Sequence, residues 1–250
     1  MPGTPPYVEL HCHSAYSFLD GTSLPGELIA RAGELGHSAL ALTDHDSLAG
    51  AMELAMSACD SPVRPIFGAE VTVASPDPAN DEERHRHLTL LVRDAQGWRN
   101  LCRLLTRAHA HTRDSTDRRA GQPSVALQDV LGHAEGLVCL SGCAASGIHD
   151  EATCRRLLDA FGPERFRVEL QRRYARGDRA QIKQLVRLAQ RLGVPAVATG
   201  DVHAHTQMRA FLQDAFVSVR EGVSLDGSEV KRRPNHTHVL ASPAGMARRF

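Results

Sequence analysis

The chain has 250 residues, which is enough for one large α/β domain with a well-buried core. Its 29 Lys and Arg residues equal its 29 Asp and Glu residues, which excludes an overall basic field for nucleic acid or an anionic membrane, so any DNA contact must be local. The six cysteines include no Cys-x-x-Cys pair, and the sequence has no export signal, so we expect reduced thiols in a cytoplasmic protein. Nowhere do 18 apolar residues run together, so we expect no membrane span.

Short apolar runs that predict strands alternate along the chain with periodic segments that predict helices. The expected strands are 7–10, 38–44, 64–73, 88–93, 135–142, 165–170 and 195–201. The expected helices are 25–36, 47–58, 95–110, a segment around 151–160, and 179–193. Because helices separate the strands, we expect parallel pairing with right-handed crossovers. Seven strands in one domain favour a closed α/β barrel over an open sheet.

Histidine is unusually frequent, with 14 residues, and this excess suggests metal binding. Five pairs read His-x-His, at 11/13, 85/87, 109/111, 203/205 and 236/238. His109 and His111 end a predicted helix, where residues i and i+2 diverge, and His236 and His238 lie beyond the last predicted strand. We therefore expect these two pairs at the surface.

In an α/β barrel the functional side chains gather at the carboxyl ends of the strands. Five of the seven predicted strand ends carry side chains that bind metals, namely His11 and His13, Asp44 and His45, Glu70, Cys143, and Asp201 and His203. Residues i and i+2 of an extended chain point the same way, so His11 and His13 can face one centre, as can Asp201 and His203. Asp20 returns to them from the following loop.

Three of these residues also have a purely structural interpretation. Asp44 could cap the helix that begins near Ser47, Glu70 could be a solvated strand residue, and Cys143 could be a small buried hydrophobe. These interpretations do not explain why all of the candidates fall at one rim of the predicted barrel. The joint placement therefore favours a metal site.

Six motifs in this order resemble those of the polymerase and histidinol phosphatase (PHP) family: "ELHCHSAYSFLDG", "ALTDHDSLAGAMEL", "FGAEVTV", "HLTLLVRD", "LSGC" and "ATGDVH". Their spacing is most similar to the N-terminal domain of bacterial DNA polymerase III alpha subunits, and "YSFLDGTSLPGELIARAGELG" is most similar to the error-prone branch. The resemblance implies a distorted seven-stranded barrel of the PHP type, an α/β fold around up to three metal ions. We expect one such domain over residues 1–250.

The resemblance implies nine metal ligands: His11, His13, Asp20, His45, Glu70, His87, Cys143, Asp201 and His203. Asp20 and Cys143 stand where phosphatase-type relatives usually have histidine, which is typical of polymerase-linked members. His87 rests on the motif "HLTLL" alone, because it precedes its predicted strand. Imidazole, carboxylate and thiolate together suit two to three ions of zinc, manganese or iron, with zinc favoured. Among the carboxylates we expect Asp44, Glu70 and Asp201 to act in catalysis, with Glu70 bridging metals.

Two or three metal ions about 3.5–4 Å apart can generate hydroxide and hold both the attacking and the leaving oxygen of a phosphoester. Phosphoester hydrolysis is therefore the expected reaction, and a DNA 3' end the expected substrate, as in a proofreading 3'-to-5' exonuclease. Two alternatives stay open. One is a free-standing phosphatase for a small phosphomonoester such as histidinol phosphate, and the other is a metal-stabilised structural module of a polymerase.

The last residues, "ASPAGMARRF", predict the start of a helix with Ser242 as N-cap and Pro243 at the first helical position. This interrupted helix favours a domain excised from a longer polymerase chain, whose remaining part would be its partner. Two short basic runs could contact phosphates or could simply be solvated surface. They comprise Arg172, Arg173, Lys231, Arg232 and Arg233.

Overall fold

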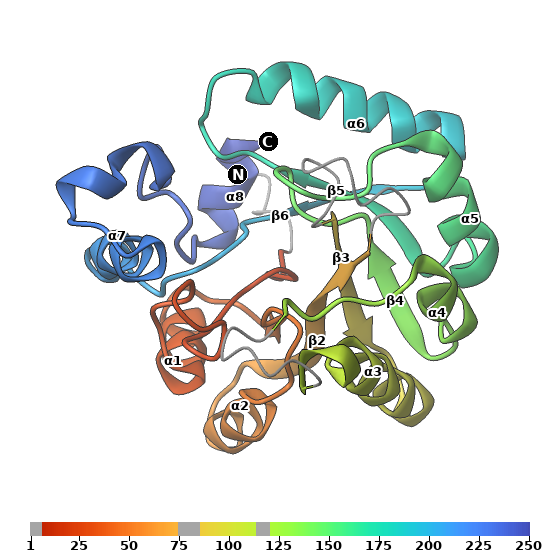
Figure 1. The fold of residues 1–250 in the computed structure, drawn as a ribbon, viewed down its shortest axis with the longest axis horizontal. Helices are drawn as coiled ribbons and strands as arrows, with labels where there is room; N and C mark the ends of the chain where they lie inside the picture. The colour runs from red at the N-terminus through yellow and green to blue at the C-terminus, as the bar shows by residue number, and fades with distance from the viewer. Residues whose placement is uncertain (1–6, 75–85, 114–120) are drawn as a thin grey trace.

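The computed structural model describes residues 7–74, 86–113 and 121–250. A curled six-stranded sheet lies at the centre, and helices surround it (Figure 1). The strands are β1 (Ala39–Leu42), β2 (Arg64–Val73), β3 (Arg86–Val92), β4 (Leu137–Leu140), β5 (Phe166–Gln171) and β6 (Ala196–Thr199). The helices are α1 (Pro25–Glu34), α2 (Ala51–Ala58), α3 (Ala95–Ala108), α4 (Leu127–Gly132), α5 (Glu151–Phe161), α6 (Asp178–Leu192), α7 (Gln207–Glu221) and α8 (Pro243–Arg249), with short 3-10 helices η2 (Ala110–Arg113) and η3 (Asp226–Lys231).

The strands follow one another across the sheet in chain order, but they are not all parallel. β3 runs antiparallel to both β2 and β4, whereas the other neighbours pair in parallel. The prediction of uniform parallel pairing is therefore wrong at β3. Parallel pairing needs a long crossover, usually a helix, and the sequence from 75 to 86 is a polar stretch in which no helix is predicted.

The first predicted strand, at 7–10, is also wrong as a strand. Glu9 makes a single parallel bridge to β1, and Cys12 makes another to Val202, just after β6. The segment thus lies between the two edges of the sheet. Directly after residue 10, two backbone N–H groups are bound by side chains, since His11 N donates to Glu9 Oε1 and Cys12 N donates to Thr43 Oγ1, each at 3.0 Å. Because these donors are occupied, a continuous ladder does not form.

The reversed direction of β3 explains the position of His87. In the β2–β3 register Thr72 pairs with His87 and Glu70 pairs with Thr89, so the start of β3 lies beside the end of β2. His87 therefore reaches the same rim as the carboxyl ends of the parallel strands. Its place before the apolar run, which conflicts with an all-parallel barrel, is correct for an antiparallel strand.

Alternate strand residues face two different environments. On the outer face Val71, Val73, Leu88 and Leu90 join the main apolar core, which also contains residues of α3, α5 and α6. The residues between them face inward, where Thr89 Oγ1 lies 3.1 Å from His11 Nδ1. The outer face is thus packed with helices, and the inner face is left to polar side chains near the rim.

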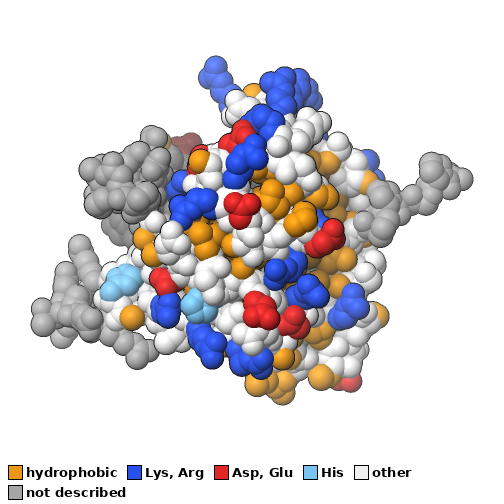
Figure 2. Space-filling model, turned by 90° about the vertical axis from the view of Figure 1, so that its right-hand side faces the viewer, with side chains coloured by type: hydrophobic (Ala, Val, Ile, Leu, Met, Phe, Trp, Pro, Cys, Tyr) orange, Lys and Arg blue, Asp and Glu red, His pale blue; other side chains and the backbone are white. Residues whose placement is uncertain are grey.

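The helix predicted to start after Ser242 is present as α8, and Ser242 Oγ accepts a hydrogen bond from Gly245 N at 3.1 Å. Helices α4 and α7 are not predicted from the sequence. No helix in the described part of the chain is long and apolar enough to cross a membrane. On the side of α4 and α5, basic and acidic side chains are interspersed (Figure 2), as expected for equal numbers of the two charges.

Candidate metal centre

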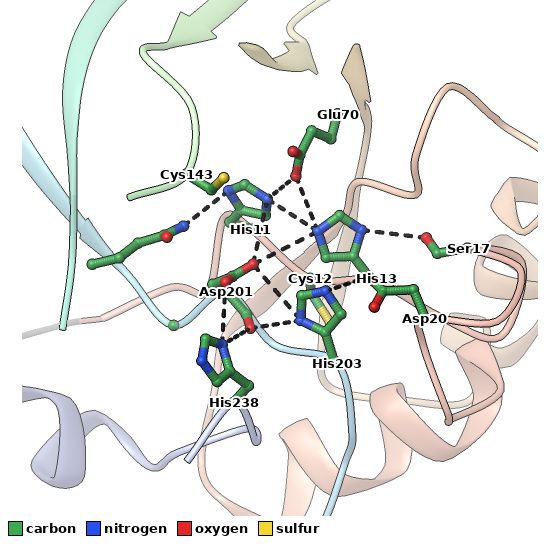
Figure 3. A network of polar contacts seen from close by, with 12 residues as sticks. His11, Cys12, His13, Ser17, Asp20, Glu70, Cys143, Asp201, His203 and His238 are labelled. Carbon is green, nitrogen blue, oxygen red and sulfur yellow. Dashed lines mark hydrogen bonds and ion pairs between the residues drawn. The ribbon is translucent and has the colours of Figure 1, made fainter. Parts of the chain in front are cut away.

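Histidine and carboxylate side chains converge at the inner rim of the curled sheet (Figure 3). Four groups of three have ligand atoms within 4.8 Å of one another, namely His11, His13 and Glu70; His45, Glu70 and His87; His13, His45 and His203; and Asp201, His203 and His238. Each group shares at least one member with another. The groups therefore form one continuous cluster.

His11 and His13 point the same way, as their extended spacing predicts. His11 Nε2 lies 2.5 Å from Glu70 Oε2, and His13 Nε2 lies 3.1 Å from the same oxygen. The two Nε2 atoms are 3.1 Å apart. Three donor atoms thus converge from two elements that are far apart in the sequence.

The second oxygen of Glu70 faces a different pair of imidazoles. Oε1 lies against His87 Nδ1 and is 3.9 Å from His45 Nδ1. This buried oxygen has no hydrogen bond of normal geometry to any described residue. A carboxylate with one oxygen toward His11 and His13 and the other toward His45 and His87 has the arrangement of a bridging ligand.

Asp20 closes the cluster from the loop after the first histidine pair. Its Oδ2 lies 2.8 Å from His203 Nε2 and 3.2 Å from His45 Nε2. Gln213 on α7 donates to Oδ1 of Asp20 at 3.1 Å. The unpredicted helix α7 therefore fixes the orientation of a predicted ligand.

Asp201 connects the first histidine pair to a residue that we did not expect in the site. Its Oδ1 lies 3.9 Å from His11 Nε2 and 3.8 Å from His13 Nε2, while Oδ2 lies 3.1 Å from His238 Nδ1. Asp201 has a φ of 50°, a strained backbone conformation for this residue. The strain places its carboxylate between the two sides of the cluster.

The prediction that His238 lies at the surface is wrong, because the residue is 6% exposed. His203 N donates to the carbonyl of His238 at 2.9 Å, so the segment around 238 lies beside the end of β6. Of the other residues predicted to be exposed, His111 is exposed, and His109 and His236 are half-buried. His205 binds Ser23 instead of the cluster, and His85 lies outside the described residues.

The ionisation of the cluster suits cations. Burial alone would raise the pKa of Glu70, but the charges of His45, His11 and His87 outweigh it and hold that pKa well below its usual range. Burial is likewise outweighed at Asp20 and Asp201, where His203 is the main cause of a strongly lowered pKa. For His13, burial itself lowers the pKa well below its usual value, so the imidazole is neutral and can donate its lone pair.

Two inward-facing residues orient the first histidine pair from behind. His11 Nδ1 lies 2.7 Å from Glu169 Oε1, and the carboxylate is fully buried. Ser17 Oγ donates its proton to Asp44 at 2.7 Å and lies 3.3 Å from His13 Nδ1. In the contact between Ser17 Oγ and His13 Nδ1, the proton is therefore the one on the imidazole. In both histidines Nδ1 is thus engaged and Nε2 faces the cluster. A carboxylate behind a ligating histidine is the usual outer partner in metal sites.

The first of these partners also affects the charge of His11. Burial lowers the pKa of His11, but Glu169 and Glu70 on its two sides raise it well above its usual value. Because this raised pKa favours the protonated imidazole, a metal ion that binds His11 Nε2 would have to displace one proton from it.

Asp44, which we expect to act in catalysis, lies beside the cluster and not in it. Its carboxylate accepts hydrogen bonds from Ser14 N, Ser14 Oγ and Ser17 Oγ at 2.6, 2.8 and 2.7 Å. It does not cap α2, which begins at Ala51. The geometry suits a residue that positions the loop of His13.

Cys143 lines a cavity together with His45, Glu70 and His87, but it belongs to none of the four ligand groups. Its Sγ is 3.1 Å from Ser146 Oγ, which is 3.1 Å from His87 Nδ1. Burial lowers the pKa of His87, but Glu70 and Cys143 raise it to about 10. Of the nine predicted ligands, seven belong to the four groups, Asp20 contacts their histidines directly, and Cys143 contacts His87 through Ser146.

The cavity in front of the cluster has a volume of about 200 Å³ and is lined by His45, His87, Asp201 and His203 on one side. Arg173 and Arg233 line it as well. Arg173 Nε and Arg233 Nη1 are buried and have no hydrogen-bond partner among the described residues. Guanidinium groups with free donors beside a cation-binding cluster are suited to an anionic ligand such as a phosphate.

The donor set fits divalent metal ions. It combines neutral imidazole nitrogens with ionised carboxylates, and Glu70 Oε1 is a buried acceptor without a proton donor of normal geometry. Histidine and carboxylate ligands of this kind suit zinc, manganese and iron alike. The cluster is therefore a candidate centre for more than one ion.

The chain is similar to known proteins over most of its length. The PHP domain model matches residues 9–173, more than half of the chain. The error-prone DNA polymerase of Anaeromyxobacter sp. (strain K) is 38% identical over 251 residues, which cover 99% of this chain and 21% of that protein. The error-prone DNA polymerase of Symbiobacterium thermophilum is 34% identical over 98% of this chain and 23% of its own length. The chain thus spans about a fifth of the length of the curated relatives it matches.

Two solved structures share the fold at low sequence identity. A Bifidobacterium adolescentis protein described as a metal-dependent phosphoesterase has a TM-score of 0.57 and 16% identity, with coverage of 80% of this chain and 88% of the other. An amidohydrolase from Chromobacterium violaceum has a TM-score of 0.54 and 20% identity, with coverage of 78% and 87%. From its sequence motifs, its fold and these matches, the chain belongs to the PHP domain family.

Proposed function

We propose that this domain hydrolyses phosphoesters with two to three divalent metal ions, and that its substrate is the 3' end of DNA. The observation that carries the proposal is the continuous cluster of ligand groups, joined through Glu70, His13 and His203, in front of a cavity with two arginines. The polymerase relatives support DNA as the substrate. Metal ions held here would lower the pKa of a bound water and polarise the phosphoester.

The residues of this chain have distinct roles in the proposal. His11, His13 and Glu70 would hold one ion, and Glu70 would share a second with His45 and His87. Asp201 and His238 would complete the site on the side of His203. Zinc, manganese and iron are all compatible with these donors. Cys143 would contribute through its contact with Ser146 and not as a ligand of the same groups.

The two arginines would hold the phosphate. Arg173 and Arg233 line the same cavity as Glu70 and Asp201, so a phosphate between the arginines and a metal-loaded cluster would have cations on both sides. Such fixed charges stabilise the negative charge that develops on phosphate oxygens in the transition state.

The test is replacement of both Asp201 and His203 by Asn. Because the apolar core is untouched, the fold should survive, and phosphoester cleavage should fall by several orders of magnitude. Cleavage of a single-stranded DNA 3' end and of glycerol phosphate is measured with manganese and with zinc. The matched control is Asp214→Asn with His236→Asn, an Asp–His pair 3.1 Å apart that lies outside the cluster, with Asp214 on α7 and His236 after η3. Equal rates in the Asp201/His203 variant and the wild type would refute the proposal.

The size of the cavity favours a second candidate, a phosphatase for small phosphomonoesters. A volume of about 200 Å³ is smaller than most drug-sized ligand sites, so it suits a phosphate group with a short substituent. Hydrolysis of glycerol phosphate without cleavage of DNA would select this candidate. A protein that binds metals but cleaves neither substrate would be a structural module of the larger chain.

A further inference from the structure

The loop after β5 carries an exposed aromatic side chain next to the cavity. Arg173 and Ala175 both line the cavity, and Tyr174 lies between them in the sequence. Tyr174 is 50% exposed. Its ring is not part of an apolar core cluster, so burial in the core does not explain its position.

The backbone of Tyr174 is strained. Its φ is 56°, in the left-handed region that bulky side chains rarely adopt. Residues held in such conformations persist only where their surroundings fix them, and they gather at functional sites. Asp201 in the metal cluster is another of the four non-glycine residues with positive φ in the described chain.

Several contacts hold the loop in this conformation. Asn235 donates to the carbonyl of Arg173 at 2.8 Å, and Ala175 N donates to Asp178 at 3.2 Å. The guanidinium carbons of Arg172 and Arg249 lie 5.0 and 5.6 Å from the centre of the Tyr174 ring, within the range of cation–π attraction. The ring is therefore displayed by a fixed loop, which lowers the entropic cost of binding to it.

Two basic runs flank the cavity. The loop contributes "RRYAR" from 172 to 176, and the end of η3 with the two residues after it contributes "KRR" from 231 to 233, with no acidic residue in either run. One arginine from each run, Arg173 and Arg233, lines the cavity. In a chain whose charges balance, this places a local positive region at the mouth of the site.

We propose that Tyr174 is a stacking platform for one base of a single-stranded nucleic acid whose adjacent phosphate lies in the cavity, with Arg176 and Lys231 near the next phosphates. The proposal rests on the proposed function, because it assigns a nucleotide subsite to the same centre. A basic groove with an aromatic side chain is the combination that binds single strands, since every base has a π face and every linkage a negative charge.

The first experiment measures binding without chemistry. The metal-loaded protein is titrated into a fluorescent, nuclease-resistant phosphorothioate oligothymidylate of about ten nucleotides, the size of one single-strand site. Tyr174→Gly removes the ring with its contacts to Arg172 and Arg249, and it also relieves the backbone strain. We expect binding about tenfold weaker, the effect of losing one stacked base, and wild-type affinity for Tyr174→Phe.

Two further variants separate the role of the ring from that of charge. Trp98→Leu removes another partly exposed aromatic, on α3 near the opposite end of β3, and should leave binding unchanged. Arg176→Gln should weaken binding and reduce the slope of log K against log salt by about 1, as for the loss of one phosphate contact. The corresponding change at Arg187, which is exposed on α6, serves as its control.

Hydrolysis assays distinguish this proposal from the proposed function. For Tyr174→Gly we expect KM for single-stranded DNA to rise about tenfold and the rate on glycerol phosphate, which has no base to stack, to stay unchanged. If oligothymidylate does not bind the wild type, or binds Tyr174→Gly equally well, the stacking site is refuted even when hydrolysis is present. If Tyr174→Gly weakens binding but the wild type cleaves neither substrate, the stacking site stands and the hydrolytic function fails.

Discussion

Replacement of Glu169 by Gln tests whether the cluster is a metal centre in which Glu169 fixes the orientation of His11. Glu169 accepts from His11 Nδ1 at 2.7 Å and from Gln171 Nε2 at 2.9 Å, and it also accepts from Thr199 Oγ1. Glutamine has nearly the same shape but lacks the charge, and its amide group adds a donor where its neighbours already donate. The ring of His11 therefore loses the partner that fixes its orientation.

The expected magnitude follows from burial. Loss of an outer-shell partner of a ligating histidine costs roughly 10–100-fold in metal affinity, or about 1.4–2.7 kcal/mol. The side chains of His11 and Glu169 are both 0% exposed, so solvent cannot replace the lost interaction, and we expect the upper part of this range. The hydrogen bonds to the charged group should also cost the fold about 1.5–3 kcal/mol.

Competition with a chelator of known affinity gives the dissociation constant for zinc and for manganese. Glu9→Gln is the matched control, because Glu9 is equally buried and binds Tyr7 and the backbone N–H groups of His11 and Gly200 without touching an imidazole ring. The control should lose thermal stability and keep its metal affinity. Wild-type metal affinity in a folded Glu169→Gln protein would show that the cluster is not organised around Nε2 of His11.

The remaining predictions concern metal content, pH and packing. Elemental analysis after chelator-free purification should give about two to three divalent ions per chain, and a metal-free protein would refute the centre. Burial lowers the pKa of His13, but at His11, His45 and His87 the carboxylates outweigh burial and raise the pKa, to about 10 for His87, so protons compete with the metal at these imidazoles. Metal occupancy, and with it the melting temperature of the metal-loaded protein, should therefore fall steadily as pH drops from alkaline to acidic values, and an occupancy independent of pH would contradict this. Gly97→Ala would place a methyl group 1.8 Å from the carbonyl oxygen of Gly136 and should cost at least about 1–3 kcal/mol in denaturant unfolding, whereas Gly132→Ala, with open space around it, should be neutral or stabilising.

Much of the secondary structure is predictable because hydrophobic periodicity carries it. The segment 64–73 has the same bounds as β2. The helix predicted from residue 25 begins where α1 begins, with Pro25 as its first residue. Helix α7 escapes prediction because its face toward solvent includes Met208 and Phe211, at 79% and 54% exposure, which blurs the amphipathic pattern. Local sequence therefore specifies elements well where one face is polar.

Hydrophobic periodicity predicts neither the direction of β3 nor the irregular pairing of the segment 7–10. Periodicity does not distinguish parallel from antiparallel pairing, so β3 can be placed only from the sequence that connects it to β2. At 7–10 the apolar pattern is correct, but Glu9 and Thr43 bind the backbone donors of His11 and Cys12. Such competition depends on residues 31 positions apart in the case of Thr43, and no local window contains it.

The candidate site is predictable from the sequence where residues that can bind metals stand at the carboxyl ends of predicted strands. The extended spacing of His11 and His13 gives their common direction, and the resemblance supplies Asp20 and His87. Glu169 could have been found as the one acidic residue inside the strand-like run 165–170. His238 could not, because it is brought to Asp201 by backbone pairing with the end of β6 and not by any strand of its own.

The order in which the ligands are synthesised has a consequence for the newborn chain. His11 and His13 emerge from the ribosome first, and their partner Asp201 and its neighbour His238 emerge last. The separation of His11 and His238, roughly 230 residues, takes about 10–45 s at typical elongation rates. During that interval a nascent chain holds imidazoles and a carboxylate that can capture an ion with incomplete coordination. The complete set of ligand groups can therefore form only after residue 238 has left the ribosome.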